Sequence, residues 1–169
     1  MELDKIRQEI DAVDTKMKAL FQKRMELSYQ VVESKKQTGG AVYVPEREQA
    51  IISARSKDME TEYLLEYQAF LKQLMGISRT YQYTKLVGAS EALQKIDFNK
   101  EEIMLVFPYR PENNSLSMAL NAIALANLTV KSVETVMENG QNTCYLCIGG
   151  DFTTEIAKAA ILLIIEENK

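Results

Sequence analysis

The chain has 169 residues, of which 46% are hydrophobic, and a formal net charge of −4. This length accommodates one large or two small domains, and the hydrophobic content is enough for packed cores. The charge is uneven, since residues 1–86 carry 14 Lys/Arg against 13 Asp/Glu, whereas residues 87–169 carry 6 against 11. The second half is therefore too acidic for a nucleic-acid-binding surface, and the asymmetry indicates two modules.

Three other properties of the sequence narrow the function. The chain contains no His, which removes the usual general base and the commonest metal ligand, so no metal site is expected. No apolar run reaches the ~18 residues that a membrane span requires, and the first ten residues are charged throughout, so we expect a cytoplasmic protein without membrane contact. Cys144 and Cys147 form a C-x-x-C in a predicted strand, whereas a redox pair needs a thiol at a helix N-terminus; both are expected to be packing thiols.

Residues 3–36 are predicted to form one long amphipathic helix that ends at the Gly39-Gly40 pair. Its seam positions recur alternately every three and four residues, which is the pattern of a helix packed on partner helices. These positions are Leu3, Ile6, Ile10, Val13, Met17, Leu20, Arg24, Leu27, Val31 and Ser34. At ~1.5 Å per residue the helix is about 50 Å long, too long to bury its face within a small monomer, so we expect a homodimer.

Arg24 occupies a seam position where an apolar residue is expected. A buried guanidinium needs an anion beside it, because leaving it unpaired costs several kcal/mol. Lys35 lies on the same face, about 16 Å away along the helix axis, so both side chains can reach a ligand between them. Taken singly, such cations are more often solvated charges paired with carboxylates such as Glu33 and Glu46.

Two more predicted helices carry polar residues on faces that should be buried. The second helix has Arg47 beside Glu48, and the third presents Ser78 and Gln82, one turn apart, in line with its apolar stripe. Polar side chains on such faces of three helices favour a pocket for a polar ligand. The second and third helices are predicted at PEREQAIISARSKD and at about Thr61 to Leu86.

The pattern LDKIRQEIDAVDTKMKALFQKRMELSYQVVESK, then PEREQ, then ISRTYQ, resembles the all-helical chorismate mutases over roughly residues 3–86. In that family two chains interlock and each contributes its long helix to both active sites, which implies an intertwined dimer. Arg7 lies about 25 Å from Arg24 along a straight helix, too far to hold one small ligand from the same chain. The resemblance therefore implies a shared pocket with catalytic Lys35, Gln82, Arg24 and Glu48, and substrate-binding Arg47, Ser78 and the other subunit's Arg7.

The reaction that the resemblance implies is the Claisen rearrangement of chorismate to prephenate, in phenylalanine and tyrosine biosynthesis. It transfers no proton to the enzyme and needs no cofactor, so a site without His or metal suffices. In this reading the arginines clamp the substrate's carboxylates, while Lys35 and Gln82 donate to the ether oxygen as negative charge grows on it. Arg47, Ser78 and Glu48 hold the ring end and its hydroxyl.

Val44 departs from the family pattern, because many members have an Asp at this position, three residues before the Arg of the R-E pair. That Asp helps to bind the substrate hydroxyl. Glu48 can still accept the hydroxyl, so weaker or differently tuned binding is expected here, with activity retained.

Residues 98–169 are predicted to form a βαββα module with a hairpin turn at Asn139-Gly140. With the segment NSLSMALNAIALANLTVKSVET, this order resembles the ferredoxin-like ACT domains that bind amino acids, without their last strand. The resemblance implies an aromatic amino-acid effector held by Asn114, Ser115, Leu116, Val133 and Glu134. A dimerisation domain that has lost its ligand is the alternative. The predicted fold is α+β, with a helical domain at 1–88, a linker at 89–97 and the ACT-like domain at 98–169.

Two other functions stay open at this point. An isochorismate-pyruvate lyase has a closely similar cationic pocket for a close isomer of the substrate. A non-catalytic subunit would bind chorismate or a partner enzyme and regulate it through the ACT-like half.

Overall fold

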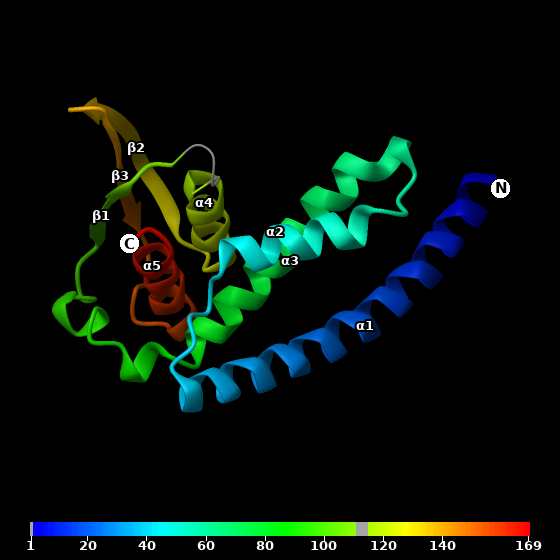
Figure 1. The fold of residues 1–169 in the computed structure, drawn as a ribbon, viewed down its shortest axis with the longest axis horizontal. Helices are drawn as coiled ribbons and strands as arrows, with labels where there is room; N and C mark the ends of the chain where they lie inside the picture. The colour runs from blue at the N-terminus through cyan, green and yellow to red at the C-terminus, as the bar shows by residue number, and fades with distance from the viewer. Residues whose placement is uncertain (1, 111–114) are drawn as a thin grey trace. The chain divides into compact units, whose positions relative to one another are not determined.

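The computed structural model describes residues 2–110 and 115–169. In chain order the described residues form three helices, α1 to α3, and then a module with the order β1-α4-β2-β3-α5. The α+β fold class and the βαββα order are therefore confirmed (Figure 1). The chain divides into two compact units, residues 1–40 and 41–169.

The first unit consists of α1, a single helix of 37 residues from Glu2 to Thr38. At ~1.5 Å per residue its length is about 55 Å. It ends as predicted, at Gly39, whose φ of +73° is left-handed and whose N–H donates to the carbonyl of Lys35 at 2.8 Å. The stripe from Leu3 to Leu20 is exposed, with Leu20 at 71% and Ile6 at 48%. An isolated α1 therefore leaves a continuous apolar face uncovered.

Helices α2 and α3 form an antiparallel pair that begins the second unit (Figure 1). Helix α2 spans Pro45–Ser56, with Pro45 in the first turn, where its missing N–H costs nothing. Helix α3 spans Leu64–Thr84, and a 3-10 turn at Thr61–Tyr63 leads into it, so the regular helix begins slightly later than the sequence predicts. The pair is joined by a small apolar cluster of Ile52, Leu71 and Met75.

The sheet has the strand order β1-β3-β2 and is antiparallel throughout. Its strands are β1 at Glu102–Pro108, β2 at Thr129–Glu138 and β3 at Gln141–Gly149. The β2–β3 turn is the predicted Asn-Gly hairpin, since Asn139 and Gly140 both have positive φ. Alternate residues of β1 and β3 are buried, as expected for a sheet with one covered face.

Helices α4, at Ser115–Leu125, and α5, at Glu155–Glu167, supply much of the core that covers this face. Thr154 caps α5, because its hydroxyl accepts a hydrogen bond from the N–H of Ala157 at 3.3 Å. The same core includes Tyr83 from the end of α3 and Leu93 from the segment predicted as a linker. The C-terminal module is therefore packed against the end of α3.

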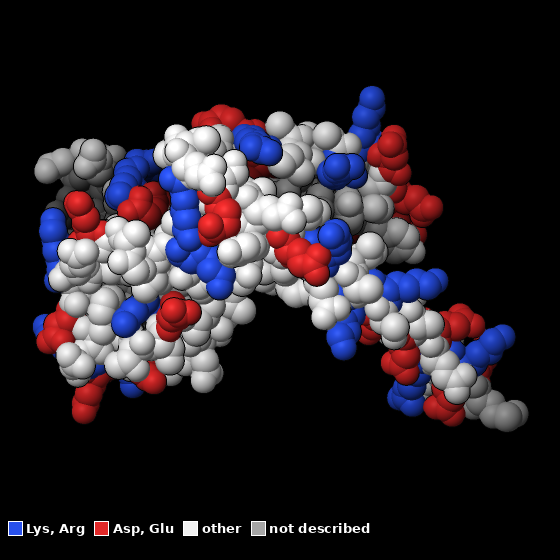
Figure 2. All heavy atoms as spheres, turned by 90° about the horizontal axis from the view of Figure 1, so that it is seen from below, with Lys and Arg blue, Asp and Glu red and all other residues white. Residues whose placement is uncertain are grey.

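Positive and negative side chains are interspersed over the face seen in Figure 2, and no broad patch of one sign extends across it. No helix among the described residues is long and apolar enough to cross a membrane.

Candidate functional site

The predicted site residues are distributed over both units of the chain. Arg7, Arg24 and Lys35 lie on α1, and the other four lie on α2 and α3. Arg7 is exposed, and its Nη1 is 3.4 Å from Asp4 Oδ1, one turn earlier on the same helix. An exposed pair of this kind contributes little to stability, so Arg7 is available to another partner.

Ser78 and Gln82 lie one turn apart on the buried side of α3, as the spacing predicts, and are 4% and 7% exposed. The Ser78 hydroxyl donates to the carbonyl of Leu74 at 2.9 Å. Gln82 Oε1 is buried and has no hydrogen-bond partner among the described residues. Buried polar atoms are nearly always paired, so an unpaired amide oxygen is a feature expected of a ligand site.

Glu48 lies on α2 and points toward α3, where its Oε1 accepts a hydrogen bond from Arg79 Nη1 at 2.5 Å. Arg79 follows Ser78 directly in the chain, and only 3% of its side chain is exposed. Its Nε donates to Glu167 Oε1 on α5 at 2.7 Å. One buried guanidinium therefore joins α2, α3 and α5 through two carboxylates.

The surroundings of Arg79 determine the protonation of its neighbours. Burial raises the pKa of Glu167 to about 7, although Arg79 opposes this shift. Burial also raises the pKa of Tyr83, and Glu167 adds to that shift. Burial by itself would lower the pKa of Arg79, but Glu167 and Glu48 together raise it, so the guanidinium stays charged. The Tyr43 ring lies 4.6 Å from Arg79 Cζ, which is cation–π distance.

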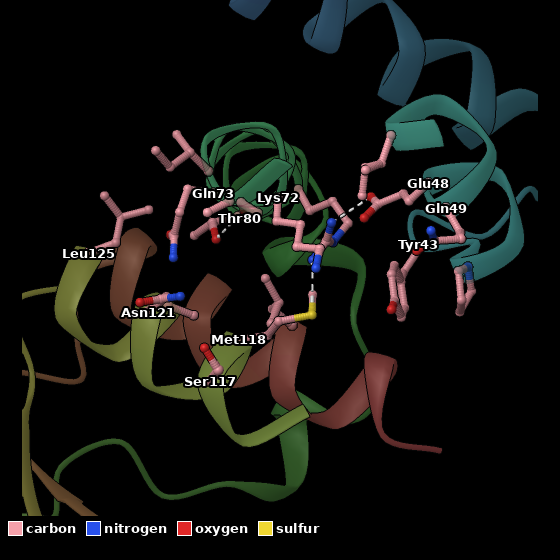
Figure 3. A pocket seen from close by; sticks show the side chains of 18 of the residues that line it. Tyr43, Glu48, Gln49, Lys72, Gln73, Thr80, Ser117, Met118, Asn121 and Leu125 are labelled. Carbon is pink, nitrogen blue, oxygen red and sulfur yellow. Dashed lines mark hydrogen bonds and ion pairs between the residues drawn. The ribbon is translucent and has the colours of Figure 1, made fainter. Parts of the chain in front are cut away.

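A cavity of about 820 Å³ opens between the α2–α3 pair and α4. Glu48 reaches it from α2 and Met118 from α4 (Figure 3). The thioether of Met118 is 3.7 Å from Arg79 Nη2. The polar residues of the wall include Gln49, Lys72, Gln73, Thr80, Ser117 and Asn121. The second unit contains two of the predicted catalytic residues, Glu48 and Gln82. Glu48 lines this cavity, and Gln82 does not.

The residues predicted to bind an effector lie at the start of α4 and on β2, except that Asn114 falls outside the described residues. Ser115 is buried, and its hydroxyl accepts from the N–H of Arg110 at 3.1 Å. Leu116 packs against the main core. Val133 and Glu134 are exposed neighbours on β2, so their side chains point to opposite faces of the sheet.

Arg79 and Glu167 were not predicted as site residues from the sequence. The signal for Arg79 was present, because Met75 and Arg79 are one turn apart on α3 and place a cation in an apolar stripe. This is the same signal that singled out Arg24. Glu167 gave no comparable signal, because its partner lies 88 residues earlier in the chain.

Cys144 and Cys147 lie on β3 as predicted, and both are free thiols. Cys144 is fully buried, whereas Cys147 is partly exposed and its Sγ is 3.8 Å from Glu102 Oε2. Within residues 2–110 and 115–169, no group of three or more His, Cys, Asp or Glu side chains is arranged to hold a metal ion.

Comparisons with known proteins match the helical part of the chain. Residues 6–83 match the family model of chorismate mutase type II. A T-protein from Enterobacter agglomerans is 42% identical over 59 residues, which are 35% of this chain and 16% of that protein. A T-protein from Haemophilus influenzae is 45% identical over 58 residues, 34% of this chain and 15% of that protein. The matched segment therefore covers about a sixth of each relative. No solved structure gives a significant match.

Proposed function

Because residues 6–83 match the family model of chorismate mutase type II, we propose that this chain is a chorismate mutase that rearranges chorismate to prephenate. The observation that carries the proposal is the position of the seven predicted catalytic and substrate-binding residues, all of which lie inside the matched segment. The substrate is a dicarboxylate, and phenylalanine and tyrosine biosynthesis is the pathway that this activity serves.

In the proposed site, the side chains hold the substrate in position and stabilise developing charge electrostatically. The reaction is intramolecular, so the enzyme must keep the substrate in its folded reactive shape and stabilise charge on the breaking ether oxygen. Arg24 and Arg7 of the partner subunit bind the two carboxylates through planar guanidinium groups. Lys35 and the Gln82 amide donate to the ether oxygen, a contact that strengthens in the transition state.

At the ring end of the proposed pocket, Arg47, Ser78 and Glu48 fix the ring and its hydroxyl. Val44, which replaces the family Asp, has no carboxylate to offer. It sits just before α2 in extended conformation, and its side chain makes no cap hydrogen bond. Glu48 is therefore assigned the hydroxyl, with binding tuned differently from family members that have the Asp.

The homodimer is part of the same proposal. Its support is the exposed apolar stripe of α1, a helix of 37 residues whose own unit contains nothing to cover that face. Burying it against a second copy would remove a large apolar surface from water, which is the main driving force for association. The same arrangement would bring Arg7 of one subunit to the pocket of the other.

We also propose that residues 98–169 form an ACT-like domain that binds an aromatic amino acid and regulates the mutase. Three antiparallel strands in the order β1-β3-β2 with α4 and α5 support this, being the ferredoxin-like pattern without a last strand. Residues 1–88 are then the catalytic domain and 89–97 the linker. A module used only for dimerisation is the alternative, and a cytoplasmic location stays a prediction.

A prephenate-formation assay with purified full-length chain tests the main proposal, run beside isochorismate and with or without phenylalanine or tyrosine. Prephenate formed far faster than spontaneously supports the mutase. Pyruvate from isochorismate alone would show a lyase instead, and binding of chorismate without turnover would show a non-catalytic subunit.

A further inference from the structure

Arg79 is a buried charged residue, with 2% of the residue exposed. It lies on α3 between Glu48 of α2 and Glu167 of α5. The family resemblance assigns it no role, although it follows Ser78 directly in the chain. A buried arginine with two carboxylate partners is costly to assemble, so its presence calls for a physical explanation.

The geometry around Arg79 explains how the guanidinium is held. Different nitrogens serve the two carboxylates, Nη1 for Glu48 and Nε for Glu167, so the planar fork has a defined orientation. The side chains of Tyr43 and Met118 limit it further, at 4.6 Å from Cζ and 3.7 Å from Nη2. Arg79 can therefore transmit the position of α5 to Glu48.

The consequence for Glu48 is a fixed carboxylate at the edge of a cavity. Its side chain is 22% exposed, and the pair with Arg79 uses Oε1. A flexible glutamate would lose rotamer freedom on binding a ligand, whereas one already held by Arg79 has lost most of that freedom on folding. The Oε2 atom is then available at a defined position for the hydroxyl of a bound ligand.

We infer that Arg79 is a positioning residue that holds Glu48 for the substrate's ring hydroxyl, and that Glu167 holds Arg79 in place. The inference rests on the proposed mutase activity and on the assigned role of Glu48. It makes the C-terminal helix part of the substrate-binding apparatus, although Glu167 itself touches no substrate. Through the two ion pairs of Arg79, the position of Glu48 in the pocket depends on the position of α5.

A double-mutant cycle on the full-length chain tests this inference, with chorismate as the substrate and kcat and KM measured separately. Arg79→Met removes the charge and both hydrogen bonds, and Glu48→Gln weakens the acceptor. Each single change should raise KM about 10-fold, because the hydroxyl contact is made in the ground state as well as in the transition state. In the Glu48→Gln background, Arg79→Met should change KM by less than about 2-fold, since the two residues act as one unit.

Glu167→Gln extends the cycle to α5. It should raise KM about 2- to 5-fold with Arg79 present and have no effect on KM in the Arg79→Met background. Arg79→Lys keeps the charge but cannot reach both carboxylates as a fork, so its KM should fall between wild type and Arg79→Met. The matched control is Arg55→Met, an exposed arginine on α2, which should leave both constants unchanged.

The readouts separate positioning from general destabilisation. Partial unfolding lowers the active fraction and therefore the apparent kcat, but it leaves KM as it is. If Arg79→Met does not fold, Arg79→Lys and Glu167→Gln carry the test by themselves. An unchanged KM in these variants, or equal effects in both Glu48 backgrounds, overturns the inference.

The outcomes also separate this inference from the proposed function. A wild-type chain that forms no prephenate overturns both. An active wild type whose Glu48→Gln variant has normal kinetics removes the role of Glu48, and the inference with it, but leaves the mutase. An active wild type with a high KM in Glu48→Gln alone overturns only the role of Arg79.

Discussion

Arg79 Nε lies 2.7 Å from Glu167 Oε1 although 88 residues separate them in the chain, and this contact ties the end of α3 to the end of α5. The two side chains are almost fully buried, at 3% and 4% exposure. Removing Arg79 leaves Glu167 buried without its cation, whereas removing Glu167 leaves Arg79 with Glu48 as its carboxylate partner. Both the stability of the chain and its dependence on pH should therefore reflect this contact.

The first prediction concerns stability against pH. The pKa of Glu167 is raised by burial to about 7 from an ordinary value of 4.5, so between these values the folded chain keeps a proton that the unfolded chain has lost. The stabilisation from this group is complete below about pH 4.5 and is lost as pH rises through about 7, a change on the order of 3 kcal/mol. Glu167→Gln should flatten that slope in urea unfolding between pH 5 and pH 7.5. Glu155→Gln, at the exposed start of α5, is the control and should keep it.

The second prediction concerns catalysis. Lys35→Ala should raise the activation free energy by about 2–4 kcal/mol and so lower kcat roughly 30- to 1,000-fold. The reason is that Lys35 is proposed to stabilise charge that develops only in the transition state. The next residue provides the control, since Lys36 pairs with Glu33 at 2.7 Å on a partly exposed surface, and Lys36→Ala should be nearly neutral. Circular dichroism verifies the fold of both variants. Near-normal turnover of Lys35→Ala would show that the assigned pocket is wrong.

The third prediction concerns the shared site. Arg7→Ala and Arg24→Ala chains should each be nearly inactive, yet regain activity when they are unfolded and refolded together. In a mixed dimer, one pocket has both arginines and the other has neither. The activity of each mixed dimer should therefore approach that of one wild-type site. Tagged chains show by affinity capture that mixed dimers have formed. Mixed dimers without activity would rule out sites built from two subunits.

The fourth prediction concerns the effector. Calorimetry of the full chain with phenylalanine, tyrosine and tryptophan should show binding of one of them, with a change in turnover, because an effector shifts activity only if it binds two states unequally. Glu134→Ala, on exposed β2, should weaken that binding, and Glu101→Ala, exposed just before β1, should not. No heat with any of the three would leave residues 98–169 as a structural module.

The sequence predicted the elements well because their signals are local. The three-and-four spacing predicted α1 to within two residues of its ends, and the Asn139-Gly140 pair predicted the hairpin. The network around Arg79 was not predicted, because its partners come from α2 and α5, and no spacing rule relates residues 31 and 88 positions apart. Burial of Ser78 and Gln82 followed from the helical period, whereas the pairing of Glu48 depended on how whole elements pack.

The central strand β3 also determines the redox behaviour of the two thiols. Cys144 and Cys147 are three residues apart on a regular strand, so they point to opposite faces and their Cα atoms are about 10 Å apart. A disulfide needs Cα atoms within about 7 Å, so closing one would require β3 to leave its ladder with both β1 and β2. The geometry of β3 therefore prevents a disulfide between Cys144 and Cys147 as long as the sheet is intact.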